Sequence, residues 1–140
     1  MVQAVNARLY DVIIDARTDS GTFGRGKIYL LDPDVQNMLW VPRGFLHAFI
    51  VPNMSDMAIF EYYCDNVYDK PSEIGCNPMS IVPKLMNDYI CDFPELKDML
   101  NSLDAGNVNL SDKDSTNPDC DVLLSNLMTE YLSSNSIWYK

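Results

Sequence analysis

The sequence has little of several features that would assign it to a common functional class. It contains one histidine, His47, and four cysteines that form no C-x-x-C pair. Imidazole-rich zinc, iron or manganese sites need three or four ligands, so we expect no metal centre. No apolar run approaches the roughly 18 residues of a membrane-spanning helix. The first residues lack the basic and then apolar pattern of a secretion signal, which favours a cytoplasmic protein with reduced thiols.

Positive charge is also scarce, because Lys and Arg number 10 against 20 Asp and Glu, for a formal net charge of −10. An acidic surface repels phosphate backbones, so we expect no nucleic-acid partner, and no membrane partner either. A local arginine pocket can still hold one small anion, because distant charges are screened. The chain has 140 residues, 47% of them hydrophobic, which is enough length and apolar content for one domain with a hydrophobic core.

The first two thirds of the chain have the pattern of short strands separated by turns. Their residues are rich in Val, Ile, Tyr and Phe, and several segments alternate between apolar and polar positions. Strands at this spacing favour a barrel or a sandwich over βαβ units. The strands are expected over 7–17, 27–31, 38–42, 47–51 and 57–69.

The last third changes to helical spacing. We expect a helix over 93–103 with Asp92 as its N-cap, a loop over 106–119 and a second helix over 120–132. The predicted fold is therefore mainly β, a small antiparallel β-barrel or jelly roll with C-terminal helices. It forms a single domain over 1–140, with the strands in 1–83 and the helical and loop part in 84–140.

The segment Pro42–His47 fits the P-x-G-x-x-H element that many cupins carry. Proline and glycine make a tight turn into a strand, and the histidine then points into the barrel, where a ligand can bind. A lone histidine beside apolar residues also has a purely structural interpretation, so both remain open. Burial statistics place Trp40 and Phe49 in the core, and the cysteines in core or half-buried positions.

Several motifs in series resemble the dTDP-4-dehydrorhamnose 3,5-epimerase family, from residue 2 to about residue 128, with a looser match over 75–109. Each motif alone is weak, and their order along the chain makes the resemblance specific. The matching strings are YDV at 10–12, DAR at 15–17, SGTFG at 20–24, LWVPRGFLHAF at 39–49, EYYCDNVYD at 61–69 and LSDKD at 110–114.

The resemblance implies a cupin-type jelly-roll β-barrel with C-terminal helices, which needs no cofactor. It also implies a homodimer or higher oligomer and a 4-keto-6-deoxy sugar nucleotide as the ligand. Family members epimerise that sugar at C3 and C5, which requires a general base, enolate stabilisation and a general acid. By position, Tyr62 is the implied acid and Asp114 the carboxylate that orients the base. The implied substrate-binding residues are His47, Asp15 and Arg17.

The family's base histidine belongs to an R-G-x-H-x-Q segment that the printed sequence does not contain, and the family's lysine near the enolate is missing too. We therefore expect the chain alone to be at best a very poor epimerase that binds a sugar nucleotide weakly. Two alternatives stay open. His47 takes over as the base, or the protein is a non-catalytic jelly roll that binds a sugar or assembles with other proteins.

Overall fold

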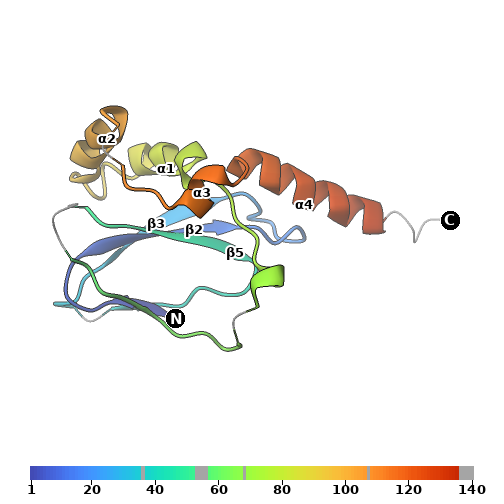
Figure 1. Ribbon diagram of the computed structural model, residues 1–140, viewed down its shortest axis with the longest axis horizontal. Helices are drawn as coiled ribbons and strands as arrows, with labels where there is room; N and C mark the ends of the chain where they lie inside the picture. The colour runs from blue at the N-terminus through green and yellow to red at the C-terminus, as the bar shows by residue number, and fades with distance from the viewer. Residues whose placement is uncertain (36, 53–56, 68, 107, 136–140) are drawn as a thin grey trace.

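The strands of the computed structural model form two antiparallel three-stranded sheets, which lie one above the other in Figure 1. The structure describes residues 1–35, 37–52, 57–67, 69–106 and 108–135. One sheet has the order β4-β1-β6, from β1 (Val2–Ala4), β4 (Met38–Leu39) and β6 (Phe60–Tyr62). The other has the order β3-β2-β5, from β2 (Leu9–Asp15), β3 (Gly26–Leu31) and β5 (Phe45–Ile50).

The helices lie on the side of the β3-β2-β5 sheet that faces away from the other sheet (Figure 1). Single turns of 3-10 helix precede them at η1 (Lys70–Ser72) and η2 (Pro78–Ser80). The α-helices are α1 (Val82–Asp88), α2 (Leu96–Asp104), α3 (Asp112–Thr116) and α4 (Cys120–Asn135). Two antiparallel sheets with helices on one side are thus the observed architecture, and the closed jelly-roll barrel stays a prediction.

Strand β2 is the centre of the molecule, and all seven of its residues are buried. Its side chains alternate between two environments because successive residues of a strand point to opposite faces. Tyr10, Val12 and Ile14 pack against α1, α2 and α4, whereas Leu9 packs against β1 of the other sheet. Each large apolar side chain buried in this way stabilises the fold by about 1.5–3 kcal/mol. The face that β2 turns toward the other sheet also carries two carboxylates, Asp11 and Asp15.

Several sequence expectations for individual elements are confirmed, and others are wrong. Strands β2 and β3 and helix α4 lie where their patterns predicted them. The long strand expected over 57–69 is reduced to the three residues of β6, with Tyr68 outside the described residues. Helix α2 begins after Glu95, so Asp92 is not its N-cap. The expected loop over 106–119 contains α3, because the Ser111 side chain accepts a hydrogen bond from the Asp114 N–H and caps a helical turn.

The cysteines differ most from expectation. Cys76 and Cys120 form a disulfide, with their Cα atoms 4.9 Å apart, whereas Cys64 and Cys91 are exposed thiols. A parallel bridge between Asn77 and Asp119 brings together the two segments that carry these cysteines, which are 44 residues apart in the sequence, and no spacing rule could anticipate this pairing. The prediction of reduced thiols is therefore wrong for Cys76 and Cys120, and the prediction of core or half-buried positions is wrong for Cys64 and Cys91.

Two aromatic residues expected in the core are mostly exposed. Trp40 directly follows β4, an edge strand of its sheet, and Phe49 lies on β5, an edge strand of the other sheet. An edge strand has a neighbour on one side only, so its large side chains are covered less completely than those of β2. None of the helices in the described part of the chain is long and apolar enough to cross a bilayer.

Candidate functional site

A cleft of about 1730 Å³ is bordered by both sheets and by the helices. Its lining includes His47 from β5, Phe60 and Tyr62 from β6, and Lys113 and Asp114 from α3. Three of the five site residues predicted from the sequence, His47, Tyr62 and Asp114, therefore border one space. They come from three elements that are far apart along the chain.

His47 has a buried acidic partner. Its Nε2 atom lies 2.7 Å from Oδ2 of Asp11, whose side chain is 0% exposed while that of His47 is 27% exposed. An ionised carboxylate only accepts hydrogen bonds, so Nε2 is the donor and the lone pair of neutral His47 is on Nδ1. The pair thus has the form of a base whose tautomer and orientation are set by a buried carboxylate.

Sequence reasoning missed Asp11, although it lies in the YDV motif. In the pairing of β2 with β5, His47 lies opposite Ile13 and Phe49 lies opposite Asp11. Asp11 and His47 are therefore diagonal neighbours on the same sheet face, within reach of a histidine side chain. The strand register is the signal that would have found the pair, and it requires knowing that β2 pairs with β5.

Asp11 also keeps one carboxylate oxygen unused. No described residue forms a hydrogen bond with its Oδ1 atom, although that atom is buried. A buried polar atom without a partner is costly, and in native proteins it often marks a functional site or an ordered water.

Aromatic rings connect the histidine to the tyrosine. The Phe60 ring stacks on His47, with ring centroids 5.8 Å apart, and lies 6.3 Å from the Tyr62 ring. Phe49 stacks on the same Phe60 ring, with ring centroids 4.7 Å apart. Tyr62 itself is 68% exposed. His47 and Tyr62 therefore both contact Phe60, which places a candidate base and a candidate acid in one aromatic cluster at the cleft.

Asp114 has a local role at the N-terminus of α3. Its backbone N–H donates to Ser111 Oγ at 3.1 Å, and Ser111 Oγ donates in turn to its carboxylate at 2.6 Å. The carboxylate that His47 contacts is that of Asp11. The neighbouring Lys113 forms an ion pair with Glu73, which also lines the cleft. The role of Asp114 as the orienter of a base, implied by the resemblance, stays a prediction.

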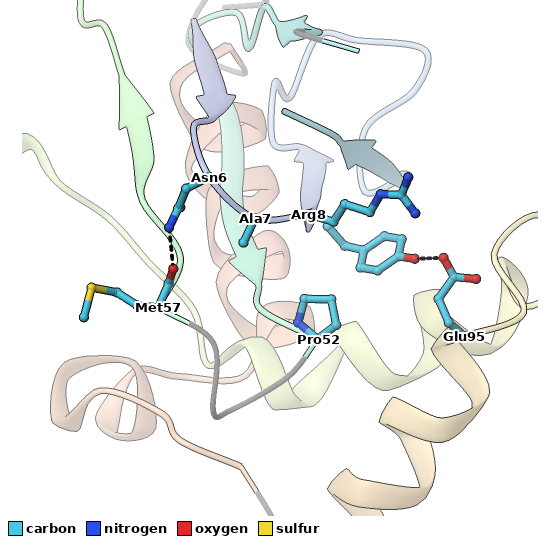
Figure 2. Close-up of a pocket in the computed structure, with 7 residues that line it drawn as sticks. Asn6, Ala7, Arg8, Pro52, Met57 and Glu95 are labelled. Atoms are coloured by element: carbon cyan, nitrogen blue, oxygen red, sulfur yellow. Dashed lines mark hydrogen bonds between the residues drawn. The ribbon is translucent and has the colours of Figure 1, made fainter. Parts of the chain in front are cut away.

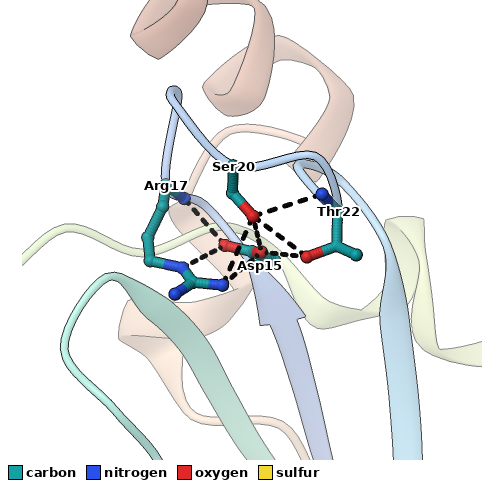
Figure 3. Close-up of polar contacts among 4 residues, drawn as sticks. All are labelled: Asp15, Arg17, Ser20 and Thr22. Atoms are coloured by element: carbon teal, nitrogen blue, oxygen red, sulfur yellow. Dashed lines mark hydrogen bonds and ion pairs between the residues drawn. The ribbon is translucent and has the colours of Figure 1, made fainter.

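Asp15 is the last residue of β2 and Arg17 lies in the turn that follows it (Figure 3). Neither is among the residues that line the cleft. Arg17 donates to the Asp15 carboxylate from Nε at 2.8 Å and from Nη2 at 2.7 Å, and Ser20 and Thr22 donate their hydroxyls to it. The guanidinium first, and then the hydroxyls, hold the pKa of Asp15 well below its ordinary value despite burial. The geometry supports a structural role in this turn, and substrate binding by either residue stays a prediction.

A second hollow, of about 920 Å³, lies at the far end of β2 (Figure 2). The Tyr10 hydroxyl donates to the Glu95 carboxylate there, and burial followed by this bond raises the pKa of Tyr10. Asn6 donates from Nδ2 to the Met57 carbonyl at 2.7 Å. These bonds connect β2 to the start of α2 and the end of β1 to the chain that enters β6. Among the described residues, no group of three or more His, Cys, Asp or Glu is placed to hold a metal ion.

Comparisons with known proteins agree on one family. The family model for dTDP-4-dehydrorhamnose 3,5-epimerase matches residues 1–121. The Escherichia coli (strain K12) protein named dTDP-4-dehydrorhamnose 3,5-epimerase is 37% identical over 75 residues, which are 54% of this chain and 40% of that protein. The protein of the same name from Mycolicibacterium smegmatis is 26% identical over 117 residues, which are 84% of this chain and 49% of that protein.

A solved structure agrees with the sequence comparisons. The crystal structure of dTDP-4-dehydrorhamnose 3,5-epimerase from Elizabethkingia anophelis NUHP1 matches with a TM-score of 0.61 and 28% identity, over 86% of this chain and 57% of that one. The chain spans about half or less of the length of the curated relatives described above. Because the family model covers most of its residues, the chain belongs to the dTDP-4-dehydrorhamnose 3,5-epimerase family.

Proposed function

We propose that this chain is an epimerase-like protein of nucleotide-sugar metabolism that binds a dTDP-linked 4-keto-6-deoxy sugar in the cleft. The observation that carries the proposal is the His47–Asp11 pair, at 2.7 Å, on the wall of that cleft. Family membership supports the ligand class, because the relatives are named for a reaction on such a sugar. No cofactor is needed for the proton transfers that this reaction requires.

Proton transfer in the cleft follows from the roles that the side chains can take. The hydrogens at C3 and C5 are acidic because each carbon adjoins the C4 ketone. Nδ1 of His47 accepts the proton, and the buried Asp11 carboxylate stabilises the imidazolium that forms. Tyr62, whose ring also contacts Phe60, returns a proton to the opposite face of the enolate. His47, Tyr62 and Asp11 are thus the proposed reacting and orienting groups.

We expect the rate of the chain alone to be low. Inversion at C3 and at C5 each requires a base within reach of the hydrogen that is removed. The printed sequence has one histidine, so His47 must reach both carbons from one position. A single positioned base or acid typically contributes about 10²–10⁴-fold to a rate. The expected behaviour is weak sugar-nucleotide binding with slow exchange, and the exchange that does occur depends on His47.

We also propose that the two sheets belong to a jelly roll and that the protein forms a homodimer or higher oligomer. Large apolar side chains are exposed on or beside the β4-β1-β6 sheet, which favours burial against another chain. These side chains are Met38, Trp40, Ile59 and Tyr63. Light scattering at micromolar concentration tests the assembly, and a monodisperse monomer would refute it.

A cytoplasmic location fits a sugar-nucleotide ligand, but the Cys76–Cys120 disulfide is typical of an oxidising compartment. A cytoplasmic location and an oxidising compartment predict different numbers of free thiols on the protein. A count of four on the protein isolated from its host without reductant favours the cytoplasm, and a count of two favours an oxidising compartment.

The test of function is incubation with a dTDP-linked 4-keto-6-deoxy sugar in D₂O, with deuterium at C3 and C5 read by NMR. We expect slow incorporation that His47→Ala abolishes, with Asp104→Asn, an exposed residue at the end of α2, as the matched control. Rapid incorporation would show a competent epimerase. If calorimetry at millimolar sugar nucleotide detects no binding, the alternative holds, a structural or assembly protein that shares only the family's fold.

A further inference from the structure

The cleft contains few positive charges. Among the described side chains that line it, two carry a fixed positive charge, Lys113 and Arg43. Lys113 is paired with Glu73. Arg43 lies in the turn that leads from β4 to β5 and so from one sheet to the other. In a chain with a formal net charge of −10, such a side chain decides where an anion can bind.

The turn that carries Arg43 has a defined backbone. Pro42 precedes it, and Gly44 follows with φ of +83°, a conformation that favours glycine. A Cβ atom on Gly44 would lie 2.5 Å from Cγ of Arg17, so the turn sits directly on the Arg17 side chain. The Arg17 side chain is held in turn by Asp15. Arg43 is therefore presented from a fixed backbone position at the cleft.

Arg43 forms an exposed ion pair in which a ligand can replace the carboxylate partner. Its Nε and Nη2 atoms donate to a single oxygen, Oδ2 of Asp65, at 3.1 and 2.8 Å. The side chains are 76% and 60% exposed, and ion pairs this exposed contribute little to stability. A phosphate group offers the guanidinium two or more oxygens in the forked geometry that it binds best.

Arg43 and its partner also lie at a suitable distance from the proposed reacting groups. His47 follows Arg43 by four residues, and Asp65 follows Tyr62 by three. At about 3.3 Å per extended residue, the Cα atom of Arg43 is at most ~13 Å from that of His47. A hexose bound at His47 and Tyr62 can therefore direct its C1 phosphate toward Arg43.

We propose that Arg43 binds the diphosphate of the sugar nucleotide, and that the diphosphate displaces Asp65 from the guanidinium. This inference rests on the proposed function, because it assigns one part of the ligand to the cleft described above. In the absence of ligand, Asp65 holds the arginine and competes with the diphosphate. Asp65 therefore weakens nucleotide binding.

The test uses calorimetry of the full chain with two probes, dTDP and thymidine, which differ only in the diphosphate. We expect Arg43→Ala to weaken dTDP binding by about tenfold or more, the usual effect of losing a charge-assisted hydrogen bond, and to leave thymidine binding unchanged. Asp65→Asn should strengthen dTDP binding severalfold, because the competing carboxylate is gone. Arg25→Ala removes an exposed arginine away from the cleft and is the matched control for charge.

Each other outcome overturns the inference in a distinguishable way. If the wild type binds dTDP and Arg43→Ala binds it equally well, the Arg43 subsite is wrong and the proposed function stands. If Asp65→Asn leaves dTDP binding unchanged or weakens it, the displacement is wrong. If the wild type binds no dTDP at millimolar concentration, the proposed function and the inference both fail. Thermal unfolding of each variant, matched to the wild type, excludes loss of the fold as the cause.

Discussion

Two buried carboxylates on one strand have opposite surroundings. Asp11 and Asp15 lie four residues apart on β2 and point to the same face of the sheet, and both are almost completely buried. Asp15 accepts hydrogen bonds from a guanidinium, two hydroxyls and the backbone N–H of Arg17. Asp11 accepts one from His47 and keeps a buried oxygen without a described partner.

The comparison separates a structural carboxylate from a candidate functional one. The side-chain partners of the Asp15 carboxylate all come from the turn that follows it, so they stabilise that turn. The partner of Asp11, His47, comes from another strand and lines the cleft. Burial of a carboxylate therefore says little about function until its partners are known. The predictions below test this contrast.

The largest effect on stability should come from Asp15→Asn. The amide cannot carry the negative charge that the Arg17 guanidinium faces, and it replaces acceptor positions with donors. Loss of a buried, hydrogen-bonded ion pair costs about 3 kcal/mol, somewhat less where one partner is half exposed, as Arg17 is. Urea unfolding measures this change. A loss below about 1 kcal/mol would mean that the turn does not depend on the carboxylate.

Asp11→Asn should show the reverse pattern. Its free energy of unfolding should change by about 1 kcal/mol or less, because one hydrogen bond and one unsatisfied oxygen are involved. Deuterium exchange at C3 and C5 should fall about 10²-fold, since His47 loses the carboxylate that stabilises its imidazolium. Urea unfolding and deuterium exchange, measured on the same sample, check these two expectations. Equal exchange rates in the variant and the wild type would contradict the role of Asp11.

The pH dependence of stability should follow Asp15. Its pKa is lower in the folded state than in the unfolded chain, so the unfolded chain takes up a proton first as the pH falls. The stabilisation is therefore fully present above about pH 4, the ordinary range of an aspartate, and decreases as the pH falls further. Urea midpoints from pH 7 down to pH 2 should decline more steeply in the wild type than in Asp15→Asn. Parallel curves would refute the assignment.

The smallest effect should come from single hydroxyl deletions in the same turn. Ser20→Ala and Thr22→Val each remove one of several donors to Asp15 and leave the guanidinium in place. We expect a loss of about 1 kcal/mol for each, the usual contribution of one hydrogen bond. Thr18→Val changes a residue of the same turn that is not among the hydrogen-bond donors to Asp15, and it is the control in the same unfolding assay.

Sequence patterns predicted the elements whose environment is regular. Strand β2 is rich in β-branched and aromatic residues, and the buried residues of α4, Cys120 and Leu124, have helical spacing, so both elements can be recognised from local sequence. Strand β6 was overestimated because its aromatic residues continue past the three that are paired. Helix α3 was missed because its five residues depend on one cap at Ser111, not on an apolar period.

The residues of the candidate site were also predicted only in part. Motif order identified His47 and Tyr62, which line the cleft, and it assigned an orienting carboxylate to Asp114, which lines the cleft too but accepts a hydrogen bond from Ser111, the cap of α3. Asp11 was quoted within a motif but received no role. Its partner is 36 residues away, and their contact depends on the pairing of β2 with β5.

By itself, the sequence determined the local properties of this protein: the acidic charge, the strand and helix periods, the P-x-G-x-x-H turn and the family resemblance. These depend on residues close together along the chain or on motif order, and no folding is needed to recognise them. Only the tertiary structure decided the partners of the buried groups. His47 with Asp11, Cys76 with Cys120 and Arg43 with Asp65 each join distant segments. Strand register and the stacking of layers select such pairs, because a shift by one residue turns every side chain of a strand to the opposite face.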